Sequence, residues 1–135
     1  MKQNIYPVHI TDSHLAEDTQ NLLLKKSLQI SLAEPRITTI QAGGHLILDF
    51  GKQMNGGVRI FTFSRAQIRI HIRFGESLTE CCSTLGGSQN ATNDHALRDF
   101  ETILPKLSDV TLGETGFRFV RIDFLDDAQI GRAHV

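Results

Sequence analysis

The chain has 135 residues, of which 40% are hydrophobic and 21% are charged. This length supports one domain with a hydrophobic core and is too short for two domains of ordinary size, and the composition is typical of a folded protein rather than a disordered segment. Fourteen Lys and Arg residues balance fifteen Asp and Glu residues, so the net charge of -1 provides no field that attracts nucleic acid or an acidic membrane surface.

The N-terminal residues and the hydrophobic runs bear on localisation. Residues 1–7 lack the continuous apolar core of a secretion signal, and no later run approaches the ~20 apolar residues that span a membrane. We therefore expect a cytoplasmic protein with no membrane partner. Cys81 and Cys82 are adjacent, which strains an ordinary disulfide, so we expect free thiols in a reducing compartment.

The first element that the sequence predicts is a short N-terminal helix. Asp12 is a residue type that caps helices, and Leu15, Leu22 and Leu23 share one face of a helix that would end at Lys26. Cations at that end would interact favourably with the helix dipole. The pattern predicts at most one short helix ahead of the rest of the chain.

Alternation of apolar and polar residues predicts β-strands over most of the remaining sequence. The predicted strands are residues 28–33, 37–40, 46–50, 58–63, 67–74, 100–104 and 117–124. Asn55-Gly56-Gly57 favours a turn, so residues 46–63 are interpreted as a β-hairpin with a longer loop. The last strand has apolar residues on both faces, which predicts a central position in a sheet.

Short strands separated by turn residues indicate an all-β fold, an antiparallel β-sandwich or jelly roll. We expect residues 1–27 to be an N-terminal extension, residues 28–125 to be the sandwich domain, and residues 126–135 to be a non-native or unstructured tail. Residues 130–135, Ile-Gly-Arg-Ala-His-Val, match the translation of a common sequencing-adapter DNA, ATCGGAAGAGCACACGTC. We therefore expect the tail to be non-native from residue 130 and Val135 to be an artificial terminus.

The polar segment Gly86–Asp99 has the highest density of amide, carboxylate, imidazole and guanidinium side chains in the sequence. Asn93, Asp94 and the preceding Glu76 carry the hard oxygen atoms that Ca²⁺ binds, and amides, carboxylates and Arg98 also suit sugar hydroxyls, which both donate and accept hydrogen bonds. The segment therefore predicts a carbohydrate contact at these four residues, with a calcium ion on Asn93 and Asp94. The alternative is a loop whose polar groups bond only to its own backbone.

Other carboxylates and the histidines leave two enzymatic alternatives open. Two of Glu76, Glu80, Asp94 and Asp99 would serve as the acid and base of an inverting glycosidase if they lay ~6.5–9.5 Å apart, although hydrogen bonding within the loop accounts for them as well. His71 with Glu76, or His95 beside Asp94, would suit a transition metal in a small metal-dependent β-barrel enzyme.

A short basic stripe on the strand at residues 67–74 needs a separate interpretation. Arg69 and Arg73 flank His71 on one face, without the interleaved aromatic residues that stack on nucleic-acid bases. The stripe therefore indicates a solvated or salt-bridged face rather than a nucleic-acid track.

Four groups of residues, taken in this order, resemble a known family. They are Leu48-Asp49-Phe50-Gly51-Lys52 with Gly56-Gly57-Val58-Arg59-Ile60, then Ile72-Arg73-Phe74-Gly75-Glu76-Ser77-Leu78, then Asn90-Ala91-Thr92-Asn93-Asp94-His95-Ala96-Leu97-Arg98-Asp99-Phe100, then Thr115-Gly116-Phe117-Arg118-Phe119-Val120-Arg121-Ile122. Together they are similar to the N-terminal β-sandwich region of bacterial α-L-rhamnosidases, which are glycoside hydrolases. The likeness extends from about residue 22 to residue 125.

The resemblance implies an accessory β-sandwich ahead of an (α/α)-barrel domain, whose glutamates remove terminal L-rhamnose with inversion. No part of that barrel lies in this chain, so the resemblance implies no catalytic residue here and a chain that is inactive alone. Its implied partners are a rhamnose-containing glycan and the missing catalytic domain. Related modules bind sugar with calcium through Asp and Asn side chains, to which Asn93 and Asp94 correspond in residue type. A self-contained carbohydrate-binding module is the alternative.

Overall fold

The computed structural model describes residues 5–23, 37–78 and 99–135. In these residues the elements are β1 His9–Glu17, the 3-10 turn η1 Thr19–Leu23, β2 Thr38–Thr62, β3 Ile68–Gly75, β4 Asp99–Leu104, β5 Asp109–Phe124 and β6 Ala128–His134. The predicted all-β, antiparallel sandwich is confirmed. Within the described ranges, no helix has the length and apolar character to cross a membrane.

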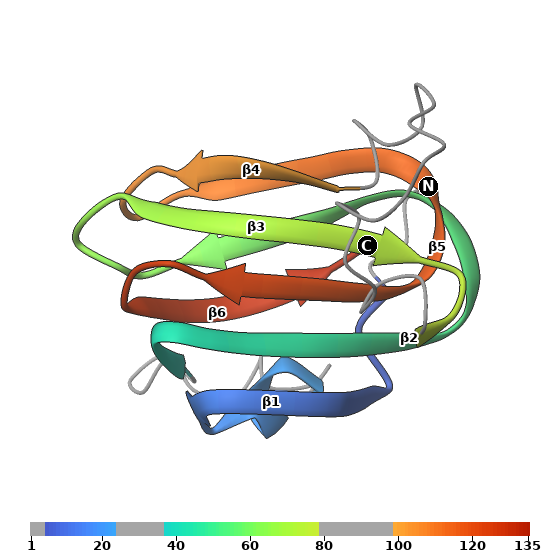
Figure 1. The fold of residues 1–135 in the computed structure, drawn as a ribbon, viewed down its shortest axis with the longest axis horizontal. Coiled ribbons are helices and arrows are strands. Elements are labelled where there is room, and N and C mark those ends of the chain that lie inside the picture. Colours follow the sequence, from blue (N-terminus) through green and yellow to red (C-terminus); the bar gives the residue numbers. More distant parts are fainter. Residues whose placement is uncertain (1–4, 24–36, 79–98) are drawn as a thin grey trace.

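Two long strands, β2 and β5, contribute to both layers of the sandwich. In the front layer the strand order is β1-β2-β5-β3-β4, with residues 45–49 of β2 paired to residues 119–123 of β5. Residues 54–61 of β2 pair with residues 109–117 of β5 in the second layer, where residues 59–62 of β2 also pair with β6. Figure 1 shows β2 and β5 curving from one layer to the other at the same end of the molecule, which we call the bend end.

Glycine permits these bends. Gly51 in β2 and Gly113 in β5 have φ values of 88° and 86°, which ordinary side chains rarely adopt, and a Cβ on Gly113 would lie 2.5 Å from the ring of Phe74. The register between the two strands also shifts between Asp49 and Met54. The hairpin predicted for residues 46–63 is therefore wrong, because each of its halves pairs with β5 instead of with the other half.

The core lies between the two layers, and β3 shows how the sequence builds it. Its apolar residues, Ile68, Ile70, Ile72 and Phe74, are all buried, while the alternate residues Arg69, His71 and Arg73 lie on the outer face. Its neighbour β5 lies between β2 and β3, which confirms the predicted central position of residues 117–124.

Aromatic rings fill the core near the bend end. Phe117 packs edge-on against Phe50 and Phe74, with ring centroids 5.8 and 5.0 Å away, and Phe100 stacks on Phe74 at 6.3 Å. Such pairs stabilise a core beyond their buried area alone. The bends of the two long strands are therefore held by a dense aromatic cluster.

The predicted N-terminal helix is wrong. Residues 9–17 form β1 and pair with β2, and only the single turn η1 follows. The leucines that suggested one helical face are separated: Leu22 is buried, whereas Leu15 is 43% exposed and has a φ of 53° beside a register shift. Pairing with β2 satisfies the backbone groups of this segment, and its weak helix preference does not outweigh that gain.

Of the two alternatives for the tail, the unstructured one is wrong. Residues 128–134 form β6, in which Ile130 and Ala133 are buried, and Val135 exchanges two backbone hydrogen bonds of 2.8 Å with Ile5. The boundaries expected at residues 28 and 125 separate no units, because β1 and β6 both pair with β2. Strand formation does not test the DNA origin of residues 130–135, which stays a prediction for resequencing of the locus.

Candidate functional site

The structure describes one of the four contact residues predicted from sequence. Glu76 is exposed immediately after β3, at the bend end. Asn93, Asp94 and Arg98, and with them the predicted calcium ligands, lie outside the described residues, as do Glu80, His95 and the cysteine pair. The rest of the site must be sought among side chains that the sequence did not single out.

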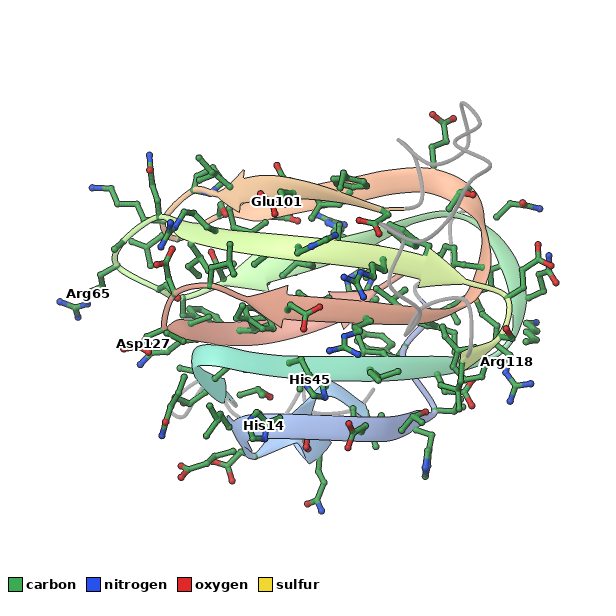
Figure 2. The ribbon with its side chains drawn as sticks, viewed as in Figure 1. His14, His45, Arg65, Glu101, Arg118 and Asp127 are labelled. Atoms are coloured by element: carbon green, nitrogen blue, oxygen red, sulfur yellow. The ribbon has the colours of Figure 1, made fainter. Side chains whose placement is uncertain are left out.

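The outer face of the front layer carries two rows of mainly polar side chains. Strand pairing places one residue from each strand in a row, namely His14, His45, Asp123, His71 and Glu101. The neighbouring row holds Asp12, Ile47, Arg121, Arg73 and Asp99. His14 and His45 stack with ring centroids 5.8 Å apart, and Figure 2 shows them side by side on β1 and β2.

Ion pairs interlock the residues of the rows. His71 Nε2 bonds to Asp99 Oδ1, and Arg73 Nε lies 3.4 Å from Asp99 Oδ2. At the β1 edge the His45 ring lies 2.8 Å from Asp12 Oδ2, and this hydrogen bond lowers the pKa of Asp12. The rows are thus a network of internally neutralised charges.

The same ion pairs explain the basic stripe of Arg69, His71 and Arg73. Arg69 pairs with Asp126 at 2.9 Å, Arg73 pairs with Asp99, and His71 contacts Asp99 and Glu101 on β4. The salt-bridged interpretation is therefore confirmed. In the part of the chain that the structure describes, no group of three His, Cys, Asp or Glu side chains is placed to hold a metal ion.

A cleft of about 460 Å³ lies at the opposite end of the sandwich from the bends, which we call the turn end. Three chain segments line it, the start of β2, the β2–β3 turn and the β5–β6 turn. The lining residues are Thr39, Ile40, Gln41, Ser64, Arg65, Ala66, Asp127, Ala128 and Gln129. Figure 2 shows Arg65 and Asp127 together at this end and Arg118 at the other.

Hydrogen bonds fix the frame of this turn-end cleft. The backbone N–H of Gln129 donates to the buried Ser64 hydroxyl at 2.8 Å, and the backbone N–H of Phe63 donates to the Gln129 carbonyl at 2.8 Å. Asp127 Oδ1 accepts the backbone N–H of Ala42 at 2.8 Å. The three lining segments are therefore held together without use of the longer polar side chains.

Those longer side chains are available to a ligand. Among the described residues, the side chains of Arg65, Gln41 and Gln129 have no hydrogen-bond or ion-pair partner, and all three are exposed. A guanidinium donates only, an amide donates and accepts, and the Asp127 carboxylate accepts. The cleft therefore presents both donors and acceptors over a small area.

A second hollow, of about 510 Å³, lies on the sheet beside the same end and is called here the lateral hollow. Its lining residues are Arg69, Ile70, Glu101, Thr102, Ile103 and Leu125. Ile103 and Leu125 are 52% and 43% exposed. Exposed aliphatic side chains next to a carboxylate and a hydroxyl give this hollow an amphipathic surface.

Sequence reasoning missed both hollows. Their residues come from segments far apart in the chain, and no single segment carries a recognisable motif. The one local indication was the polar turn Ser64–Gln67 between two strands, a position at which loops often carry binding residues. The sheet topology brings the start of β2 and the β5–β6 turn close to this polar turn.

Neither a family model nor a curated protein matches this sequence. Solved structures do share its fold. The chain is similar over its whole length to 28% of the chain of a rhamnosidase from Klebsiella oxytoca with rhamnose bound, at 18% identity and a TM-score of 0.70. The CBM32 of AlyQ in complex with 4,5-unsaturated mannuronic acid is similar over 98% of this chain and 97% of its own, at 11% identity and a TM-score of 0.62.

A third similar structure is CpGH89CBM32-6 from Clostridium perfringens, with 14% identity, a TM-score of 0.53 and coverage of 98% of this chain and 97% of its own. At these identities the likeness establishes the fold alone. The chain spans just over a quarter of the rhamnosidase and nearly all of the two modules. Its β-sandwich fold is thus shared with part of a glycoside hydrolase and with carbohydrate-binding modules of similar size.

Proposed function

We propose that the chain is a non-catalytic, carbohydrate-binding β-sandwich of a glycoside hydrolase, and that its parent enzyme is of the α-L-rhamnosidase type. The observation that carries the proposal is the turn-end cleft, in which Arg65, Gln41 and Gln129 offer unused polar groups beside Asp127. The sequence resemblance and the shared fold of a rhamnose-bound rhamnosidase support the choice of sugar.

The chemistry of the cleft suits a sugar better than a compact anion. Neighbouring hydroxyls on a sugar ring each donate and accept, so they pair well with a carboxylate, a guanidinium and amides side by side. Asp127 offsets the charge of Arg65 within the same cleft, which lowers the attraction for a phosphate or a sulfate. In the described residues the polar groups of the cleft form no nucleophile and base pair, which favours binding over catalysis.

Isothermal titration calorimetry tests the proposal. L-rhamnose, short α-L-rhamnose oligosaccharides and a mannuronate oligosaccharide are titrated into the chain, and we expect saturable heat with the rhamnose ligands. Arg65→Ala removes the exposed guanidinium and should weaken binding about tenfold to a hundredfold, the range of a lost hydrogen bond from a charged group. Lys52→Ala, which removes an exposed cation from the bend end, is the matched control. Absence of heat with every sugar contradicts the proposal.

A self-contained carbohydrate-binding module is the second candidate. The observation in its favour is that two carbohydrate-binding modules match over 97% of their own chains, so the fold also occurs as a complete module of this size. The sequence of the intact gene distinguishes the candidates. A long helical domain encoded after the sandwich supports the parent rhamnosidase, and a stop without such a domain supports the separate module.

The calcium contact is proposed for the segment outside the described residues. As the alternative to binding at the turn-end cleft, Asn93 and Asp94 would hold the ion, with Glu76 and Arg98 as sugar contacts. If this is correct, EDTA weakens sugar binding and added Ca²⁺ restores it, and the double variant N93A/D94A loses this response. Binding that ignores both EDTA and the variant excludes a role for calcium.

A further inference from the structure

The turn-end cleft and the lateral hollow lie on two sides of one short turn. Leu125, the first residue after β5, lines the lateral hollow, and Asp127, two residues later, lines the cleft. A chain extends at most ~3.3–3.6 Å per residue, so the two lining positions are within ~7 Å of each other. The hollows are therefore neighbours, separated by residue 126.

That residue forms a fixed ridge between the hollows. Asp126 accepts the backbone N–H of Arg69 at 2.9 Å and two guanidinium hydrogen bonds of 2.9 and 3.1 Å from the same residue. The backbone N–H of Leu125 donates to the Arg69 carbonyl at 2.9 Å. Main-chain and side-chain bonds together hold the β5–β6 turn against β3, so neither hollow depends on a ligand for its shape.

The two hollows differ in chemistry in a way that one extended ligand can use. The cleft presents the charged groups of Arg65 and Asp127 and two glutamine amides, whereas the lateral hollow presents the exposed aliphatic side chains of Ile103 and Leu125 beside polar groups of its own. Sugar rings carry both hydroxyls and apolar C–H faces, and binding sites for small molecules combine apolar surface with a few polar groups. Each hollow lies within the ~300–1,000 Å³ of drug-sized ligand sites, which suffices for one or two sugar units.

We propose that the cleft and the lateral hollow are two subsites for one linear oligosaccharide, which crosses the Asp126–Arg69 ridge. The inference rests on the proposed function, because it assigns the class of glycan to the same binding end. It specifies an internal stretch or a long end of a glycan chain as ligand, rather than a single terminal sugar. The first units occupy the turn-end cleft, and the later units pack on Ile103 and Leu125.

Chain length is the variable that tests the two subsites. Affinities are measured by calorimetry for α-L-rhamnose oligosaccharides of one to four units. Two linked contacts bind more tightly than either one because the second is intramolecular, so we expect the tetrasaccharide to bind about tenfold to a hundredfold more tightly than the disaccharide. Equal affinity per molecule for the disaccharide and the tetrasaccharide overturns the second subsite and leaves the proposed function standing.

Variants test whether the gain in affinity with chain length comes from the lateral hollow. Leu125→Ala and Ile103→Ala truncate exposed side chains and should remove most of the chain-length gain while the disaccharide affinity stays within about twofold of the parent value. Arg65→Ala should weaken both ligands. Val8→Ala, which truncates another exposed aliphatic residue outside both hollows, is the control and should change neither. A full gain in the Leu125 and Ile103 variants overturns the inference, and no binding of any length overturns the proposed function itself.

Discussion

The two ends of the sandwich differ in what they contribute. At the bend end, β2 and β5 pass between the layers over the aromatic cluster of Phe50, Phe74 and Phe117. At the turn end, short connections surround two hollows whose polar side chains include several without a partner among the described residues. The aromatic cluster stabilises the fold at the bend end, and the turn end carries the groups that we propose bind a ligand.

Polar residues that are close together in the sequence need not form a binding site, and residues far apart in the sequence can form one when the fold brings them together. The segment Gly86–Asp99 has the highest density of polar functional groups in the sequence. Glu76, which precedes it, and Asp99, its last residue, lie at the bend end. Arg65 and Asp127 are 62 positions apart and meet only because of the topology. Variants that separate stability from binding distinguish the two ends.

The largest effect is expected for Phe117→Ala at the bend end. Phe117 is fully buried between two other rings, and a Phe-to-Ala change in a core costs about 3–5 kcal/mol. Urea denaturation should show the loss in the free energy of unfolding. Below the unfolding transition, the sugar Kd should match that of the parent chain. A variant with parental stability or with weakened sugar binding while folded contradicts the structural role of this end.

Arg65→Ala at the turn end should show the opposite pattern. We expect sugar binding to weaken about tenfold or more with little change in Tm, since Arg65 is exposed and has no partner among the described residues. Calorimetry and thermal unfolding of the same preparation give both quantities. Lys52→Ala should leave both unchanged. If Arg65→Ala lowers the Tm and not the affinity, the functional role of the turn end is wrong.

How much of this was predictable from sequence depended on the range of the interactions. The alternation in β3 specified its strand and buried face, and the two-sided apolar pattern of residues 117–124 specified a central strand. The hairpin predicted at residues 46–63 was wrong, because glycines that favour a turn also favour a bend. The choice depended on β5, whose paired residues are 48 to 76 positions away. The cleft was not predictable for the same reason.

The predictions for the first and last strands were wrong for a related reason. Residues 9–17 and 128–134 have weak local patterns, and pairing with β2 decides their structure. Local propensity is a weak guide where tertiary pairing supplies most of the stability. The fold class was therefore predictable from the central strands, whereas the structure of both ends of the chain was not.

His134 in β6 provides a moderate test of stability outside the turn end. Its side chain is buried with no hydrogen-bond partner for Nδ1 in the structure, and burial lowers its pKa below the usual range of histidine. His134→Leu should therefore stabilise the chain by about 1 kcal/mol, because it removes an unsatisfied buried polar atom. Urea denaturation at pH 7.5 measures the difference, and a large loss of stability contradicts this account of the strand.

The same histidine predicts a pH dependence with a definite sign. Because the unfolded chain binds a proton at a pKa of ~6.5 and the folded chain only at lower pH, acidification through that range favours the unfolded state. The stability of the unsubstituted chain should therefore fall as the pH drops from about 7.5 through the normal histidine pKa. His134→Leu should reduce the slope of stability against pH. An unchanged slope in the variant would exclude His134 as its source.

The smallest effect is expected for Asp126→Asn, which weakens the ridge at the turn end. Arg69 lowers the pKa of Asp126 to about 2 through side-chain and backbone hydrogen bonds. A depressed carboxyl pKa stabilises the folded state above the unfolded value of ~3.9, and this contribution is lost as the pH falls through the folded pKa. The Tm difference between the parent and the variant should be small at pH 7 and should vanish between about pH 4 and pH 2. A difference that is constant over this range contradicts the ion-pair explanation.

The position of the bound sugar tests the central claim most directly. In a ¹H–¹⁵N NMR titration with the rhamnose tetrasaccharide, the account predicts the largest chemical-shift changes at residues 39–41, 64–66 and 125–129, with little change at Glu76 and its neighbours. Changes concentrated at Glu76, with residues 64–66 unaffected, would contradict it and place binding at the bend end.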